Sequence, residues 1–157
     1  MTTNLAFIGA GDISLLHAEA IRRCPNAKLK GLWNITSDLA KEKAAKFDCE
    51  IYESAEALVN DPEIDAVFVL TNLESHCEYA CLAMNAGKHV LVEKPVGVNI
   101  AELEEMKACA AKNNVILMPG HNYIHDDGVL RTKELIDTGK LGDLVSVYIL
   151  YNIHHPE

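Results

Sequence analysis

Short apolar runs alternate with segments of helical periodicity along most of the chain. The apolar run at residues 5–8 ends in a glycine, which is typical of a buried parallel strand, and residues 13–23 then follow with helical spacing. This alternation predicts a parallel sheet covered by helices on both faces, a Rossmann-type, doubly wound α/β fold. Further strands are predicted over residues 29–33, 51–52, 65–70, 89–92 and 115–118, and further helices over residues 37–47, 75–86, 99–113 and 127–138, with a short helix after Ser54.

Several helix ends are marked by residue type. Asn99 stands three residues before Glu102, which predicts an N-cap. Ser37-Asp38 and Ser54 are candidate caps for two other helices, although Ser54 lacks an acidic residue three positions on. Gly87 is a candidate left-handed stop. The residues expected on the buried side of helix 13–23 are Ile13, Leu16, Ala20 and Ile21.

A glycine-rich loop joins the first predicted strand to the first predicted helix. It reads Gly9-Ala10-Gly11-Asp12-Ile13-Ser14, which is G-x-G-x-x-G with Ser in the last place. Gly9 permits a tight turn, Gly11 lets a pyrophosphate approach the backbone, and the small Ser14 lets helix and strand pack closely. Amides at the helix start, around Asp12 and Ile13, then face the phosphates. The sequence therefore predicts dinucleotide binding, whereas the alternative is a glycine turn needed only for packing.

The position for recognising the cofactor ribose carries an amide. An acidic residue is expected about 20 residues after the glycine loop, at the end of the second strand. Asn34 stands there, and it can bond a hydroxyl without repelling a 2′-phosphate. Thr36, Ser37 and Lys41 follow nearby. The sequence leaves NAD and NADP both open as cofactor, and Asn34 as a simple turn residue is the alternative.

Charge and composition narrow the classes of partner. The 157 residues include 14 Lys and Arg against 23 Asp and Glu, a formal charge of −9. This balance argues against nucleic acid or an anionic membrane surface as partner. No apolar run approaches the ~20 residues that span a bilayer. With no signal peptide pattern and five Cys without a CxxC pair, we expect a cytoplasmic protein with reduced thiols.

Two segments in the middle of the chain carry a family resemblance. Thr71-Asn72-Leu73-Glu74-Ser75-His76 follows one strand, and Ala86-Gly87-Lys88-His89-Val90-Leu91-Val92-Glu93-Lys94-Pro95 contains the next. Together with the glycine loop, these segments resemble the Gfo/Idh/MocA oxidoreductases, which include glucose–fructose oxidoreductase and inositol dehydrogenases. The resemblance extends from residue 4 to about residue 153. It implies hydride transfer between NAD or NADP and a secondary alcohol or ketone of a sugar, cyclitol or nucleotide-sugar.

The resemblance implies a catalytic role for the segment after the fifth strand. Glu93, Lys94 and Pro95 would lie beside the nicotinamide, with a cis peptide before the proline. Lys94 would be the catalytic residue, because an ammonium stabilises a developing alkoxide or hands over a proton. Its expected partners, an Asp and a His of a second domain, would lie beyond Glu157.

The resemblance also implies further cofactor contacts. Thr71, Asn72 and His76 would touch the cofactor, and Asn122 matches a position near the nicotinamide ribose. Members of the family often have Arg directly after this position, whereas here Tyr123 follows. This departure leaves the substrate contacts of the loop open.

Two groups of potential metal ligands do not lead to a predicted metal site. Cys77 and Cys81 are four residues apart and adjoin His76, but buried packing is the preferred interpretation because a closed zinc site needs four ligands. The second group lies over the proposed nicotinamide site, and the family needs no metal; it comprises His121, His125, Asp126, Asp127, His154 and His155.

Two other functions remain as alternatives to a dehydrogenase. The chain could be an NAD(P)-binding module without turnover, since the partners of Lys94 would be missing. An S-adenosylmethionine-dependent methyltransferase also has a glycine-rich loop after its first strand, but the Glu93-Lys94-Pro95 run disfavours that class.

The pattern changes near residue 120. Residues 1–120 are predicted to form the dinucleotide-binding domain, and residues 121–157 the first helix and strand of an incomplete α+β domain for substrate binding and oligomerisation. Residues 144–153 alternate apolar and polar side chains, which predicts a strand of a second, possibly antiparallel sheet. Because an apolar strand edge pairs readily with another chain, we expect self-association through residues 143–153 and a homo-oligomer.

Overall fold

One sheet of six parallel strands organises the first part of the chain in the computed structural model, which describes residues 2–150. The strands are Thr3–Ile8 (β1), Ala27–Trp33 (β2), Glu50–Ile51 (β3), Ala66–Val69 (β4), His89–Val92 (β5) and Leu117–Pro119 (β6). Their order across the sheet is β3-β2-β1-β4-β5-β6. The order reverses between β1 and β4, which is the switch point of a doubly wound Rossmann fold. The predicted fold class is therefore confirmed.

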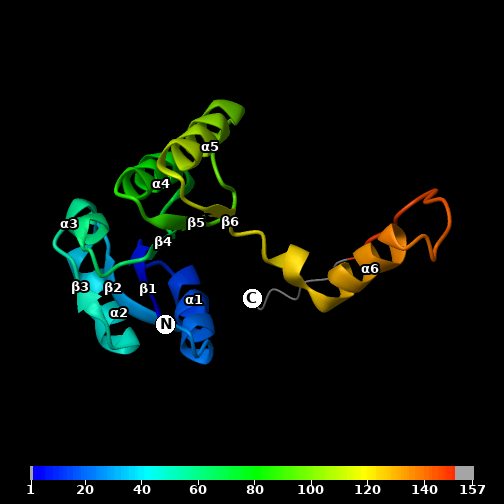
Figure 1. The fold of residues 1–157 in the computed structure, drawn as a ribbon. Coiled ribbons are helices and arrows are strands. Elements are labelled where there is room, and N and C mark those ends of the chain that lie inside the picture. The colour runs from blue at the N-terminus through cyan, green and yellow to red at the C-terminus, as the bar shows by residue number, and fades with distance from the viewer. Residues whose placement is uncertain (1, 151–157) are drawn as a thin grey trace. The chain divides into compact units, whose positions relative to one another are not determined.

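Helices cover both faces of this sheet (Figure 1). They are Ile13–Arg23 (α1), Ser37–Phe47 (α2), Ala55–Asn60 (α3), His76–Asn85 (α4) and Ile100–Asn113 (α5). Successive side chains of a strand point to opposite faces. Leu5 and Phe7 of β1 therefore pack into a core with α1 and α2, while Ala6 and Ile8 enter a second core with α3, α4 and α5.

Three of the predicted helix boundaries have the expected chemistry. The side chain of Asn99 accepts a hydrogen bond from the Glu102 amide at 3.0 Å, and that of Ser54 accepts one from the Ala57 amide at 3.0 Å. Gly87 follows α4 with φ of +78°, a conformation that favours glycine. These capping predictions are confirmed.

Other boundary predictions were wrong in detail. No side chain caps α2, which begins at Ser37 itself. A short 3₁₀ helix, Leu73–Ser75 (η1), precedes α4, which begins one residue later than predicted. Leu16 is 69% exposed and Ala20 is exposed. Of the predicted residues, Ile21 is buried and Ile13 packs half-buried against the core, as expected. The buried stripe also includes Ser14, which lies seven residues, or about two turns, before Ile21.

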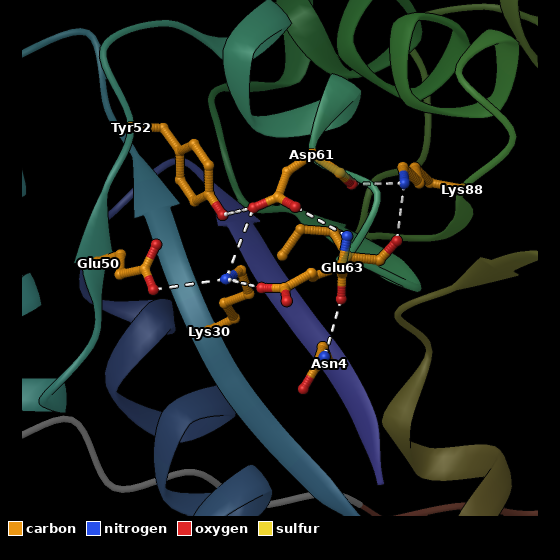
Figure 2. A network of polar contacts seen from close by, with 8 residues as sticks. Asn4, Lys30, Glu50, Tyr52, Asp61, Glu63 and Lys88 are labelled. Carbon is orange, nitrogen blue, oxygen red and sulfur yellow. Dashed lines mark hydrogen bonds and ion pairs between the residues drawn. The ribbon is translucent and has the colours of Figure 1, made fainter. Parts of the chain in front are cut away.

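A polar network joins the middle of β2 to the chain between α3 and β4, and Figure 2 shows its members. The Lys30 ammonium lies 2.6 Å from Glu63 and 3.7 Å from Asp61, and the Tyr52 hydroxyl donates to Asp61 at 2.5 Å. Burial and this hydrogen bond raise the pKa of Tyr52, while the Tyr52 hydroxyl lowers the pKa of Asp61. The network therefore holds Asp61 as a carboxylate.

Lys88 extends the network toward β5. Its side chain is buried, and the ammonium donates to the main-chain carbonyls of Asp61 and Ile64, both at 2.8 Å (Figure 2). A buried ammonium is stable only where hydrogen-bond acceptors surround it, and the turn between α3 and β4 supplies two of them. The lysine of the Gly87-Lys88-His89 segment therefore has a structural role at the start of β5.

The chain divides into two compact units, Met1–Gly120 and His121–Glu157. The described part of the second unit contains a 3₁₀ helix, Asn122–His125 (η2), and a helix, Asp127–Asp137 (α6). The Asp126 side chain caps α6 by accepting from the amides of Gly128 and Val129. Within residues 2–150, no helix is long and apolar enough to cross a membrane.

The strand predicted over residues 144–153 is not formed where the structure describes it. Residues 144–150 have no regular secondary structure and are exposed, and residues 151–153 lie outside the described residues. Alternating side chains make a strand only where a partner strand pairs with the backbone, and the described residues 144–150 pair with none. The expected self-association stays a prediction.

Replacing Lys88 with methionine tests its structural role. Lys88→Met removes the donor of the Ile64 carbonyl and one of the two donors of the Asp61 carbonyl, so we expect the free energy of unfolding to fall by about 1–3 kcal/mol. The matched control is Lys112, an exposed residue on α5. We expect Lys112→Met to change the free energy of unfolding by less than about 0.5 kcal/mol. Urea unfolding followed by circular dichroism measures both. Equal losses in the two variants would contradict the assignment.

Candidate functional site

The carboxyl ends of β1 and β4 meet at Gly9. Gly9 has φ of +101°, and a Cβ placed on it would lie 2.7 Å from the carbonyl carbon and oxygen of Leu70. The Gly9 amide donates to the carbonyl of Trp33 at 2.9 Å, which ties the same turn to the end of β2. Only glycine fits here, because both the conformation and the space exclude a side chain.

The start of α1 presents amides to solvent. Within the described chain, the main-chain amides of Gly11, Asp12 and Ile13 donate to no protein group. Ser14 is fully buried, and its hydroxyl donates to the Gly11 carbonyl at 2.6 Å. Unpaired amides at a helix N-terminus favour an anion, through their hydrogens and through the helix dipole. The arrangement suits a diphosphate.

Asn34 braces the glycine loop. Its side-chain oxygen accepts a hydrogen bond from the Ala10 amide at 3.0 Å, and its side-chain nitrogen donates to the Thr36 carbonyl at 3.1 Å. Both ends of the amide are therefore engaged within the chain. The structure gives Asn34 this loop-bracing position, and its contact with a ribose hydroxyl stays a prediction.

A pocket opens between the glycine loop and the loops after β2 and β4. Asn34 lines it from β2, and Thr71, Asn72 and Ser75 line it from β4 and η1. Two aromatic residues that the sequence analysis missed, Trp33 and Tyr79, also line it, with ring centroids 5.5 Å apart. The sequence signal for Trp33 was present, since it is the single tryptophan and directly precedes Asn34.

Thr71 and Asn72 are held by a local hydrogen-bond cluster. The Ser75 hydroxyl lies 2.8 Å from the Thr71 hydroxyl and 2.9 Å from the side-chain oxygen of Asn72. The Asn72 amide nitrogen donates to the Glu74 carboxylate at 2.8 Å. These contacts fix both side chains at the rim of the pocket.

The segment Glu93-Lys94-Pro95 follows β5, and its peptide bond between Lys94 and Pro95 is cis. One oxygen of half-buried Glu93 lies 2.8 Å from Nε2 of His17, and the other accepts from the Lys94 amide at 2.9 Å. The sequence analysis missed His17, which stands on α1 and packs edge-on against Phe68. Glu93 therefore links the phosphate-facing helix to the end of β5.

The Lys94 side chain is exposed. Its ammonium forms no hydrogen bond or ion pair with any residue in the described part of the chain. Because β5 pairs in parallel with β4, Lys94 stands at the same end of the sheet as Thr71. This placement leaves a cation available to a ligand at the carboxyl ends of the strands.

His76 connects two of these loops and is 2% exposed. Its Nδ1 lies 2.9 Å from the Pro95 carbonyl oxygen, and its Nε2 lies 3.1 Å from the Thr71 carbonyl oxygen. Both ring nitrogens therefore face main-chain oxygens. The structure places His76 between the loops after β4 and β5, and its contact with the cofactor stays a prediction.

Asn122 belongs to the second unit, where it is the first residue of η2. Its expected contact with the nicotinamide ribose stays a prediction. The other expected cofactor residues, from Gly9 to Pro95, all belong to the first unit.

Comparison with known proteins decides the family. Residues 3–121 match the family model described as an oxidoreductase family with an NAD-binding Rossmann fold. The chain belongs to the Gfo/Idh/MocA oxidoreductase family. The matched segment is the NAD-binding Rossmann domain of this family, so its cofactor is NAD or NADP.

The matched relatives include several inositol dehydrogenases. The chain is 32% identical over 139 residues to myo-inositol 2-dehydrogenase of Thermotoga maritima, covering 88% of this chain and 42% of the relative. It is 36% identical over 110 residues to scyllo-inositol 2-dehydrogenase (NADP(+)) IolW of Bacillus subtilis, covering 70% of this chain and 31% of the relative.

A solved structure shows the same fold. Scyllo-inositol dehydrogenase from Lactobacillus casei, determined with bound NAD(H) and scyllo-inositol, superposes with a TM-score of 0.83 at 29% identity, covering 91% of this chain and 43% of that one. The chain spans less than half the length of these relatives.

The two glycines of the loop give a matched pair of tests. Nothing lies within 4 Å of a Cβ on Gly11, so Gly11→Ala is expected to change the free energy of unfolding by less than about 1 kcal/mol. It should weaken NADH binding at least tenfold, because the methyl group occupies the approach of the pyrophosphate.

Gly9→Ala is expected to act on the fold itself. Its strained φ and its clash with Leu70 should lower the free energy of unfolding by at least about 2 kcal/mol. Chemical denaturation and calorimetric NADH titration separate the two effects. A Gly11→Ala variant that binds NADH as the wild type does would argue against a diphosphate at this loop.

Proposed function

We propose that this chain serves an oxidoreductase that transfers hydride between NAD(P) and a secondary alcohol or ketone of a polyol, cyclitol, sugar or nucleotide-sugar. The observation that carries the proposal is that amides at Gly11–Ile13 and the ammonium of Lys94, all without a partner among residues 2–150, lie at the same end of the sheet. Anion-binding amides and a cation for a reacting oxygen are the two protein contributions that such chemistry needs.

In this proposal the pocket residues orient the cofactor. Gly9, Gly11, Asp12 and Ile13 hold the diphosphate, with the amides of the last three as donors. Asn34, Thr71 and Asn72 line the pocket and contact the nucleoside part. The contact of Asn122 with the nicotinamide ribose rests on the family resemblance alone. Trp33 and Tyr79 supply flat apolar surfaces for a base, which favours its stacking in this pocket.

Lys94 is the proposed catalytic residue. Its ammonium would hydrogen-bond the reacting oxygen of the substrate, stabilise alkoxide character, and hold or return the proton. Glu93 positions Lys94, since its carboxylate accepts from the Lys94 amide while also contacting His17. Pro95 is part of the same loop, and its carbonyl contacts His76 below.

The cyclitol class is supported by the named relatives, which act on myo-inositol or scyllo-inositol. A cytoplasmic location and a homo-oligomer are proposed alongside and stay predictions.

A second candidate function is NAD(P) binding without turnover. It is favoured by the isolation of the Lys94 ammonium, which has no carboxylate or imidazole partner among residues 2–150.

Substitution of Lys94 separates these candidates. Lys94→Met removes the cation proposed to stabilise the alkoxide that develops as hydride leaves, so inositol-dependent reduction of NAD⁺ should fall about 100-fold or more, while NADH affinity should stay within about threefold. Lys112→Met, which alters an exposed lysine on α5, is the control. Reduced nicotinamide is followed by absorbance over a panel of inositols and sugars.

The outcomes of this assay are distinct. Turnover that survives Lys94→Met contradicts the catalytic assignment. Cofactor binding without turnover in the unaltered chain supports the binding module. A folded chain without affinity for NADH or NADPH overturns both candidates.

The choice between NADH and NADPH is expected to depend on residue 34. Asn34→Asp keeps an oxygen that accepts from the Ala10 amide but places a negative charge beside a 2′-phosphate. We expect NADPH affinity to fall about tenfold, equivalent to ~1.4 kcal/mol, and NADH affinity to change less than about threefold. Calorimetric titration of both nucleotides measures the ratio, and an unchanged ratio would place the ribose elsewhere.

A further inference from the structure

A cluster of thiols and one carboxylate lies between α4 and α5, outside the nucleotide pocket. Cys77 and Cys81 belong to α4, and Glu105 and Cys109 belong to α5. The Sγ atoms of Cys77 and Cys81 and a carboxylate oxygen of Glu105 all lie within 4.8 Å of one another. The Cys109 thiol lies beside them, with its Sγ 3.7 Å from the Cys81 carbonyl oxygen.

Helix geometry explains why these four side chains converge. Residues four apart on a helix lie on one face, one turn above the other. Each helix supplies one such pair, Cys77 with Cys81 and Glu105 with Cys109. The helices α4 and α5 pack side by side (Figure 1), so the two pairs face each other. Facing pairs on adjacent helices are a recurrent way to build a metal site.

The donor set selects a class of cation. Three sulfur atoms and one carboxylate oxygen suit a thiophilic ion such as Zn²⁺, whereas Mg²⁺ and Ca²⁺ prefer all-oxygen sites. In a tetrahedral site with metal–sulfur bonds of about 2.3 Å, ligand atoms lie about 3.8 Å apart. The ligand atoms of Cys77, Cys81 and Glu105 are within about 1 Å of that spacing. The Cys109 thiol, which lies against the Cys81 carbonyl and Asn85, would turn toward them as the fourth ligand.

We propose that Cys77, Cys81, Cys109 and Glu105 bind one thiophilic divalent cation, of the Zn²⁺ class, between α4 and α5. Each thiol that binds loses its proton to solvent, so the cation is held by thiolates and a carboxylate. His76 is excluded from the site, because both of its ring nitrogens face carbonyl oxygens elsewhere. From the sequence, only the two cysteines of α4 were candidate ligands. The two ligands of α5 come close to them only in the folded chain.

The surroundings of the cluster keep its thiols protonated and unreactive. Burial, and after it the nearby thiols of Cys109 and Cys77, raises the pKa of Cys81 to about 12. Burial also raises the pKa of Cys77, with the charges of Glu105 and Glu102 adding to the effect. Thiols in such surroundings stay protonated and are poor nucleophiles. A cation that binds here must therefore displace these protons.

Cadmium titration of the full chain, with all thiols reduced, tests the site. We expect sulfur-to-metal charge-transfer absorbance that saturates at one Cd²⁺ per chain. Cys77→Ser and Cys81→Ser should each weaken Cd²⁺ binding at least tenfold, and Glu105→Gln should weaken it less. Cys24→Ser is the matched control, because Cys24 is exposed at the end of α1 and should leave the titration unchanged.

A second measurement does not rely on substitutions in the helices. Zn²⁺ should slow alkylation of Cys77, Cys81 and Cys109 by iodoacetamide at least tenfold, as read by mass spectrometry of the digested protein, without slowing that of Cys24. Absence of the charge-transfer band in the folded chain, or equal alkylation of all thiols with and without Zn²⁺, overturns the proposal. Neither result depends on whether the chain binds NAD(P).

Discussion

The backbone at Gly9 lies against the backbone between Leu70 and Thr71, with no space for even a methyl group between them. This contact brings the ends of β1 and β4 together at the switch point of the sheet, and it sets where the α1 amides and Thr71 stand. Two side chains join the neighbouring strands to this contact, one on each side. Asn34 ties the end of β2 to the glycine loop, and His76 ties the end of β4 to the loop after β5. Four neighbouring strand ends are thereby held as one surface.

The hydrogen-bond donors of the first unit fall into two groups, those with partners within the chain and those without. In the network between β2, α3 and β5, the ammonium groups of Lys30 and Lys88 are bonded to carboxylates or carbonyls. At the carboxyl ends of the strands, the amides of Gly11–Ile13 and the ammonium of Lys94 have no such partners in the described chain. Satisfied charges stabilise the fold, while unsatisfied ones are available to a ligand.

Sequence alone predicted what depends on local periodicity and turn chemistry. The sheet, the glycine loop and the caps at Ser54 and Asn99 follow from spacings of a few residues. Contacts between distant segments were missed, because no local pattern encodes them: His17 meets Glu93 across 76 positions, and Trp33 meets Tyr79. The strand predicted over residues 144–153 is absent over 144–150, since alternation specifies a face but supplies no partner.

Strand β1 has a consequence for how the first unit comes apart. Its consecutive residues Phe7 and Ile8, both fully buried, enter the separate cores on the two faces of the sheet. If either helical layer detached, one of these β1 side chains would be exposed to water. The other layer packs on the same strand, so it would lose its support as well. The unit should therefore lose both layers in one cooperative transition, and its nucleotide-facing surface should persist intact until the whole domain melts.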